Sequence, residues 1–152
     1  NTMRARHCNW VRLRDRKSGA EFRVLDIHLD HKSDDARREQ MKMIVGECAQ
    51  YADGFPQIIC GDFNSGIENA PVACLRDAGW QEAYEAVHGP GEAGFTYHGF
   101  KGPDYRKKNA RRIDFIFVRG NLQPVAAEIL RDKVDGLYPS DHYFLMSDFI
   151  IQ

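Results

Sequence analysis

The sequence predicts an α/β protein with a layered architecture, and three observations support this. Apolar runs at Phe22–Ile27 and Gln57–Cys60 are typical of buried strands, and an amphipathic helical pattern lies between them. Strand patterns near 112–118, 124–130 and 143–150 then complete the chain. Strands that alternate with helices early and follow one another late are typical of helices packed on sheets.

The first elements are predicted to be a β-hairpin and a helix. Strand patterns at Cys8–Leu13 and Phe22–Leu29 flank Asp15–Gly19, whose turn-forming residues favour a hairpin. Ser33 can cap the helix, and two aspartates follow it in the first turn. The helix is predicted to end near Gly54–Pro56. Its apolar residues recur at spacings of three and four and predict one buried stripe: Met41, Ile44, Val45, Cys48, Ala49 and Ala52.

A second, shorter helix and a long loop follow. Asn69 can cap the helix, which runs through Ala78 and ends at Gly79. Residues 88–111 predict a long loop around a short strand at Phe95–His98, and long loops in compact domains are often functional. This region is rich in glycine and in basic residues: Lys101, Arg106, Lys107, Lys108, Arg111 and Arg112.

Length and composition favour a soluble, globular protein. The 152 residues fit a single domain, 1–152, that is large enough to bury a core. No apolar stretch approaches the roughly 20 residues of a transmembrane segment, and we expect a soluble protein, with a slight preference for the cytoplasm. The net charge of -1 excludes a uniformly basic surface, so nucleic-acid binding would need a local patch. The four cysteines lack the close pairing of a zinc site and predict free thiols, buried at Cys48 and Cys60.

Polar side chains stand at or next to four of the predicted strands. The loops beyond the carboxyl ends of strands are where ligands and catalysis gather in α/β sheets. We therefore expect one convergent active site, built from His28 with Asp30, Asp62 with Asn64, Asp114, and Ser140–His142.

His142 and Asp114 are candidates for a catalytic pair. The unperturbed pKa of histidine, about 6.5, suits proton chemistry, and a carboxylate bonded to one ring nitrogen stabilises the imidazolium. Asp114 can supply that carboxylate if its strand lies beside the one after His142. A lone carboxylate on a covered strand face costs several kcal/mol unless it is paired. The alternatives are a satisfied buried histidine and a buried ion pair between Asp114 and Arg111 or Arg112.

Asp62 and Asn64 are spaced by two residues around Phe63. In extended backbone this spacing aims both polar side chains the same way and turns Phe63 into the core. The carboxylate can accept a proton from water or bind a hard cation, and the carboxamide can donate to a phosphate oxygen. A plain Asx turn is the alternative.

The long loop offers a second set of polar groups. His98, Lys101 and the arginines around Arg111 could form a phosphate-binding rim. The alternative for most of these charges is a solvated basic surface.

Four motifs in chain order carry a resemblance to a known family. They are DIHLDH at Asp26–His31, GDFN at Gly61–Asn64, RIDFIF at Arg112–Phe117 and SDH at Ser140–His142. Together they resemble the endonuclease/exonuclease/phosphatase superfamily, which has the deoxyribonuclease-I-like fold, over nearly the whole chain. The resemblance implies a four-layer α/β sandwich of two packed sheets, and hydrolysis of phosphodiesters or phosphomonoesters with Mg2+ or Mn2+.

The resemblance also implies roles for the motif residues. Asp62 would orient or deprotonate the attacking water, and Asn64 and His28 would hold phosphate oxygens. His142, oriented by Asp114, would stabilise the charge that develops on the phosphoryl group.

Four further residues complete the predicted site. Asp141 would lie near the metal, as a ligand or through water. Asp30, His98 and Arg111 are predicted to contact the substrate.

The chain departs from the family at its amino end. Family members usually carry an earlier segment with an Asn and with the Glu that is the principal metal ligand, whereas this sequence opens at Asn1 and is expected to begin partway into a strand. We therefore expect the carboxyl-terminal two-thirds of such a domain, weakly active or inactive unless an amino-terminal segment completes the site. The alternative function is a catalytically silent fragment that binds a phosphorylated ligand or a partner.

The substrate class stays open at this point. A nucleic acid, a lipid head group and a small phosphoester all fit the same active-site plan. The net charge near zero slightly favours a small or lipid-derived phosphoester over duplex DNA.

Overall fold

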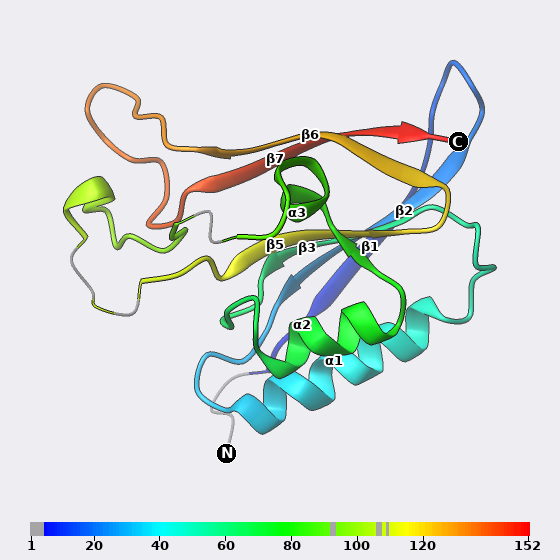
Figure 1. Ribbon diagram of the computed structural model, residues 1–152, viewed down its shortest axis with the longest axis horizontal. Helices are drawn as coiled ribbons and strands as arrows, with labels where there is room; N and C mark the ends of the chain where they lie inside the picture. Colours follow the sequence, from blue (N-terminus) through cyan, green and yellow to red (C-terminus); the bar gives the residue numbers. More distant parts are fainter. Residues whose placement is uncertain (1–4, 92–93, 106–107, 109) are drawn as a thin grey trace.

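The computed structural model describes residues 5–91, 94–105, 108 and 110–152, and it shows three layers (Figure 1). Helices α1 (Asp34–Cys48) and α2 (Ala70–Asp77) cover one face of a five-stranded sheet. A two-stranded sheet of β6 (Leu122–Leu130) and β7 (Phe144–Ile151) lies on the other side. The predicted layered α/β architecture is confirmed. The second helical layer of a four-layer sandwich is not formed by the residues that are described here.

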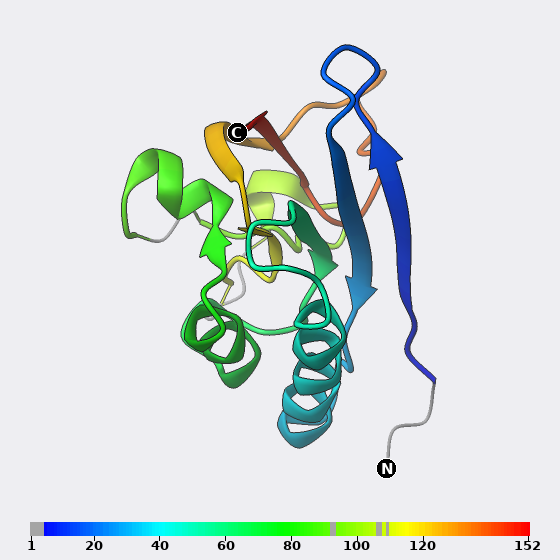
Figure 2. The same cartoon turned by 90° about the vertical axis from the view of Figure 1, so that its right-hand side faces the viewer.

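The five-stranded sheet brings the predicted site residues to one end. Its strands, in spatial order, are β1 (Cys8–Arg14), β2 (Glu21–His28), β3 (Gln57–Asp62), β5 (Asp114–Arg119) and β4 (Gln81–Glu82). β1 and β2 form the predicted hairpin, and α1 is the crossover between the parallel strands β2 and β3, seen end-on in Figure 2. His28 lies opposite Asp62 across β2 and β3, and Asp62 lies opposite Asp114 across β3 and β5. Three polar residues therefore stand side by side on neighbouring strands.

Helix α1 begins as predicted and ends early. The Ser33 hydroxyl accepts a hydrogen bond from the Ala36 N–H at 3.2 Å, which confirms the predicted cap. After Cys48 the N–H groups of Gln50 and Tyr51 bond to carbonyls three residues back, so the last turn tightens. Ala49 and Ala52 consequently lie outside the helix and are exposed, which corrects their place in the predicted stripe.

The main core lies between the five-stranded sheet and the two helices. Alternate residues of β2, β3 and β5 face Met41, Ile44 and Cys48 of α1, as the helical periodicity predicts. Phe63 follows β3 and is fully buried, with its ring edge-on to Phe115 at 5.2 Å between centroids. Full burial of one such ring stabilises the fold by about 1.5–3 kcal/mol. The prediction that Phe63 points into the core is confirmed.

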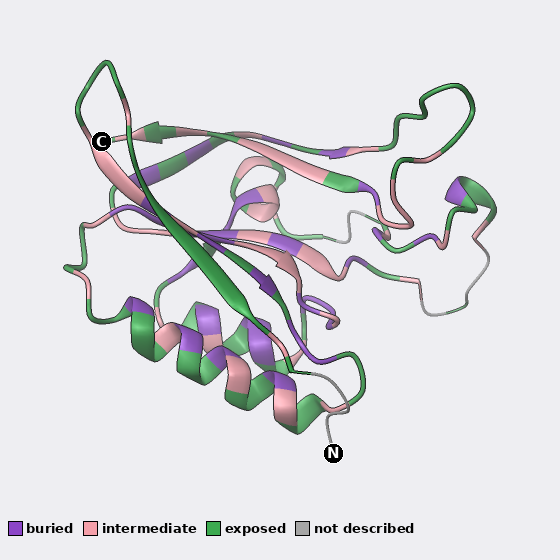
Figure 3. Ribbon diagram, turned by 180° about the vertical axis from the view of Figure 1, so that it is seen from behind, coloured by how far each residue is buried: buried purple, intermediate pink, exposed green. Residues whose placement is uncertain are grey.

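The edge strand β1 contrasts with this core. All seven of its residues are exposed, which Figure 3 shows as a continuous green strand. The four cysteines are free thiols, as predicted; Cys48 is buried, whereas Cys60 is half-buried. Among the described helices, none has both the length and the apolar character that crossing a membrane requires.

The long loop differs from its prediction. The strand expected at Phe95–His98 is reduced to a single antiparallel bridge between Tyr97 and His142. Arg106 and Lys107 lie outside the described residues. Three further elements were not predicted: the short strand β4, helix α3 (Ala83–His88), which packs against β6, and the short 3₁₀ helix η1 (Gly102–Asp104).

Candidate active site

The ends of β2, β3 and β5 face the loop before β7 across a cavity of about 520 Å³. Five of the nine predicted site residues line it: His28, Asp62, Asp114, Asp141 and His142. The first three come from the five-stranded sheet, and the last two precede β7 of the other sheet. The predicted convergence of these motifs on one site is therefore observed for these five residues.

His142 and Asp114 form a hydrogen-bonded pair. His142 Nδ1 lies 2.9 Å from Asp114 Oδ2, and the two side chains are only 22% and 16% exposed. This bond, and secondarily the negative charge of Asp114, raises the pKa of His142 above its usual value, although partial burial opposes the shift. The fold therefore favours the imidazolium form.

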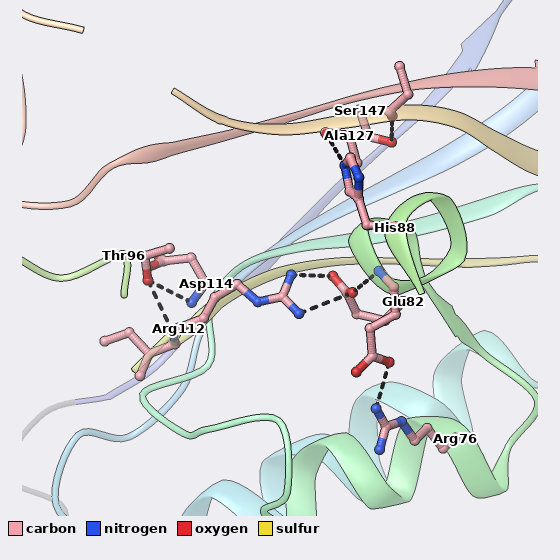
Figure 4. Close-up of polar contacts among 11 residues, drawn as sticks. Arg76, Glu82, His88, Thr96, Arg112, Asp114, Ala127 and Ser147 are labelled. Carbon is pink, nitrogen blue, oxygen red and sulfur yellow. Dashed lines mark hydrogen bonds and ion pairs between the residues drawn. The ribbon is translucent and has the colours of Figure 1, made fainter. Parts of the chain in front are cut away.

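The alternative ion pair of Asp114 with Arg112 does not form. Arg112 makes a bidentate ion pair with Glu82, with Nη1–Oε1 at 3.0 Å and Nη2–Oε2 at 3.2 Å (Figure 4). Both side chains are almost fully buried, at 2% and 1% exposed. Glu82 also accepts a hydrogen bond from the Glu85 N–H at 2.7 Å and so caps α3. No local pattern in the sequence indicates this role of Glu82, because its partner lies 30 residues away.

Asp62 is a carboxylate with an unfavourable environment for its charge. Burial raises the pKa of Asp62, and the negative charge of Asp114 raises it further. The Asn64 N–H, which donates to Asp62 Oδ1 at 2.7 Å, opposes this shift. His28 Nε2 lies 3.4 Å from Asp62 Oδ2, and its side chain is 57% exposed toward solvent. Asp62 is therefore more basic than an ordinary aspartate and sits beside an accessible imidazole.

The end of β3 and the turn after it each depend on a residue with positive φ. At Gly61 φ is +131°, and a Cβ there would lie 2.0 Å from the Ile27 carbonyl oxygen, so only glycine fits. Asn64 has φ of +49°, which excludes the extended geometry expected from its spacing to Asp62. Its Nδ2 donates to the Leu29 carbonyl at 3.1 Å, and Asn64 lies outside the cavity lining. The Asx-turn alternative therefore describes the backbone here.

Asp30 lies apart from the cavity lining. Its carboxylate accepts hydrogen bonds from the N–H groups of Lys32 and Ser33, both at 2.8 Å, and these bonds lower the pKa of Asp30. The residue is 2% exposed. Its contacts are those of a turn that leads the chain from β2 into α1.

His98 and Arg111 also stand outside the lining. The His98 side chain is fully buried, with its ring 4.5 Å from that of Tyr138 and 4.2 Å from that of Tyr143, and this burial lowers the pKa of His98. Arg111 lies over the backbone of Gly66. The structure therefore does not bring either residue to the cavity.

Three of the lining residues could hold a metal ion. Ligand atoms of Asp62, Asp114 and His142 lie within 4.8 Å of one another, whereas Asp141, the predicted ligand, lines the cavity without belonging to this group. A divalent cation would relieve the repulsion that raises the pKa of Asp62. The donor set therefore fits a divalent cation.

The family of the chain is established by a sequence comparison. The profile of the endonuclease/exonuclease/phosphatase family matches residues 4–142, and the chain belongs to this family. None of the curated proteins matches the chain.

Solved structures share the fold. A conserved protein of unknown function from Enterococcus faecalis is 26% identical, with a TM-score of 0.81, and the match covers 95% of this chain and 56% of that one. A mannosyl-6-phosphatase from Bacteroides thetaiotaomicron is 22% identical, with a TM-score of 0.80 and coverage of 95% and 57%. The catalytic domain of human Nocturnin with bound sulfate is 22% identical, with a TM-score of 0.78 and coverage of 97% and 53%. The chain thus spans little more than half the length of these proteins.

Proposed function

We propose that this chain carries the catalytic core of a divalent-metal-dependent hydrolase of phosphodiester or phosphomonoester bonds. The observation that supports this best is the His142–Asp114 hydrogen bond of 2.9 Å in the same cavity as Asp62 and His28. Membership of the family agrees with this chemistry, and the similar structures include a phosphatase. The chain spans only part of those proteins, so the activity of the whole protein is itself part of what we propose.

In the proposed reaction Asp62 accepts a proton from the attacking water. The raised pKa of Asp62 makes it a better base than an ordinary aspartate. The water oxygen forms a bond to phosphorus while the bond from phosphorus to the leaving oxygen breaks. His28, which lines the cavity with a side chain that is 57% exposed, donates to a phosphate oxygen.

His142 would stabilise the negative charge that builds up on the phosphoryl oxygens. Its raised pKa keeps a proton available for this contact near neutral pH. Asp114 holds Nδ1, so that Nε2 is the nitrogen left to face the substrate. Such preorganised donors are commonly among the largest contributors to catalysis.

The proposed metal is Mg2+ or Mn2+. Bound beside the phosphoryl group, it would supply positive charge to the non-bridging oxygens. Asp141 would hold it through a carboxylate oxygen, the kind of ligand that these ions prefer, while Asp62 acts as the base and Asp114 bonds His142. A cation on His142 Nδ1 would displace the Asp114 bond, so we propose oxygen ligation, completed by a glutamate from a segment upstream of this chain.

The test compares hydrolysis by the chain alone with hydrolysis by a version that also carries an upstream, Glu-bearing segment of a relative. Bis(p-nitrophenyl) phosphate and p-nitrophenyl phosphate report on diesters and monoesters, in Mg2+, in Mn2+ and in chelator. We expect metal-dependent turnover of at least one ester, stronger in the extended protein. His142→Ala should lower it by at least about 100-fold, the range for loss of a proton-transfer or charge-stabilising group. His31→Ala, an exposed histidine outside the cavity lining, is the matched control and should change it less than twofold.

Two outcomes would contradict the proposal. Turnover that His142→Ala leaves intact would place the chemistry elsewhere. Saturable binding of p-nitrophenyl phosphate without turnover in either protein would instead support the silent, ligand-binding alternative.

A further inference from the structure

The catalytic pair spans two separate sheets. Asp114 opens β5 of the five-stranded sheet, and His142 lies just before β7 of the two-stranded sheet. The two strands are not hydrogen-bonded neighbours, so no strand ladder sets the 2.9 Å distance between the carboxylate and the imidazole. Another part of the chain must hold the two residues in place.

The side chain of Thr96 holds the backbone at Asp114. Thr96 Oγ1 accepts hydrogen bonds from the N–H groups of Ile113, at 3.1 Å, and of Asp114, at 3.3 Å (Figure 4). The neighbouring edge strand β4 pairs only with Phe117 and Val118, so it does not reach these two N–H groups. Thr96 is 0% exposed, and water therefore does not replace it as the acceptor.

The backbone of the same segment holds His142 on both sides. The Thr96 carbonyl accepts from the Tyr143 N–H at 2.9 Å, and the Asp141 carbonyl accepts from the His98 N–H at 2.8 Å. These bonds fix the residues immediately before and after His142. Thr96 thus bonds through its hydroxyl to the backbone of Asp114 and through its carbonyl to Tyr143, the residue that follows His142.

The ring of Tyr97 adds a contact in the same place. Tyr97 faces His142 in an antiparallel bridge, and their rings meet nearly edge to face, 5.1 Å apart at an angle of 64°. The imidazole of His142 is therefore packed against the Tyr97 ring while its Nδ1 is hydrogen-bonded to Asp114.

We propose that Thr96 is a positioning residue of this active site, one that sets the Asp114–His142 distance through its hydroxyl and its carbonyl. The inference rests on the proposed function. Without the hydroxyl, the N–H groups of Ile113 and Asp114 lose their acceptor, and the start of β5 shifts away from His142. A misplacement of about 1 Å at a catalytic group can cost about 100-fold in rate. Thr96 does not line the cavity, so substrate binding should change little.

The kinetic test uses matched substitutions at Thr96 in the form of the protein that shows turnover. Thr96→Val keeps the shape and removes the acceptor, and we expect kcat to fall about 10- to 100-fold with KM within threefold. Thr96→Ser keeps the acceptor and should stay within threefold of wild type. In an Asp114→Asn background Thr96→Val should cause no further loss, because it acts through Asp114. An equal loss in both backgrounds would overturn the proposal.

A spectroscopic test is independent of turnover and separates this inference from the proposed function. The ring Nδ1–H of His142 should give a downfield proton signal in wild type and in Thr96→Ser, and it should exchange with water at least tenfold faster in Thr96→Val. An unchanged signal in Thr96→Val would overturn the inference, even in a protein without hydrolytic activity. If Thr96→Val does not fold, Thr96→Cys, whose sulfur is a weak acceptor, should show intermediate exchange. Exchange at the wild-type rate in Thr96→Cys would then be the contradicting result.

Discussion

Asp114→Asn is the substitution that most sharply tests the catalytic pair. The change is isosteric and removes the charge that His142 Nδ1 faces at 2.9 Å. The pKa of His142 is raised chiefly by this hydrogen bond, so in the variant it should fall back toward the ordinary value of about 6.5. The alkaline limb of the pH–rate profile should therefore move to lower pH.

The size of the effect follows from the burial of the pair. A hydrogen bond to a charged group contributes about 1.5–3 kcal/mol, and here both side chains are less than a quarter exposed, at 22% and 16%. At about 1.36 kcal/mol for each factor of ten, kcat should fall roughly 10- to 150-fold.

Stability should change with pH in a direction that the pKa shift fixes. Because the folded-state pKa of His142 is raised, its stabilising contribution is complete below the unfolded-state pKa, about 6.5. That contribution is lost as the pH rises through the folded-state pKa. Asp114→Asn should thus destabilise the protein more at pH 5.5 than at pH 9, as measured by urea unfolding. Equal destabilisation at both pH values, with an unmoved pH–rate profile, would refute the reasoning; Asp77→Asn, an exposed aspartate of α2, is the control.

Four further substitutions test other parts of the structure. Gly61→Ala forces a Cβ against a backbone carbonyl 2.0 Å away and should cost at least about 1–3 kcal/mol in urea unfolding. Gly46→Ala, in an exposed helix position with open space around it, should instead stabilise the protein by about 0.5–1 kcal/mol. If Gly61→Ala were the more stable of the two variants, the backbone geometry described for Gly61 would be contradicted. Glu82→Gln leaves Arg112 buried without its charge partner, and we expect a loss of about 3–5 kcal/mol in the same assay; a loss below 1 kcal/mol would show that the pair is not held as described. Asp62→Asn should lower turnover by at least about 100-fold without lowering the melting temperature, since it removes a buried, repelled charge. A variant that kept its activity would exclude Asp62 as the base.

The parts of the fold with strong local signals could be predicted from the sequence. The hairpin, the Ser33 cap and the crossover helix each depend on residues a few positions apart, and all three were found. The burial of Phe63 also followed from local alternation. The strand expected at 95–98 failed because β-propensity does not supply a partner strand, and only one bridge formed there.

The sequence was enough to predict which residues form the site, but not their backbone conformations or their packing. The motifs pointed to His28, Asp62, Asp114 and His142 because each stands at or next to a strand. The left-handed backbone of Asn64 and the inward packing of His98 depend on tertiary contacts that no local pattern shows. The same holds for Thr96, which joins segments from two sheets.

The proposed function requires that the cavity between the two sheets binds a divalent cation and that His142 takes part in the hydrolysis of phosphoesters. The most direct measurement is a calorimetric Mg2+ titration of the chain extended by the Glu-bearing segment of a relative, with hydrolysis of bis(p-nitrophenyl) phosphate followed alongside, for wild type and His142→Ala. We expect saturable Mg2+ binding in both proteins, because the proposed ligands are carboxylates, and turnover in wild type only. Turnover in the absence of Mg2+ binding, or equal turnover in the two proteins, would contradict the proposed function.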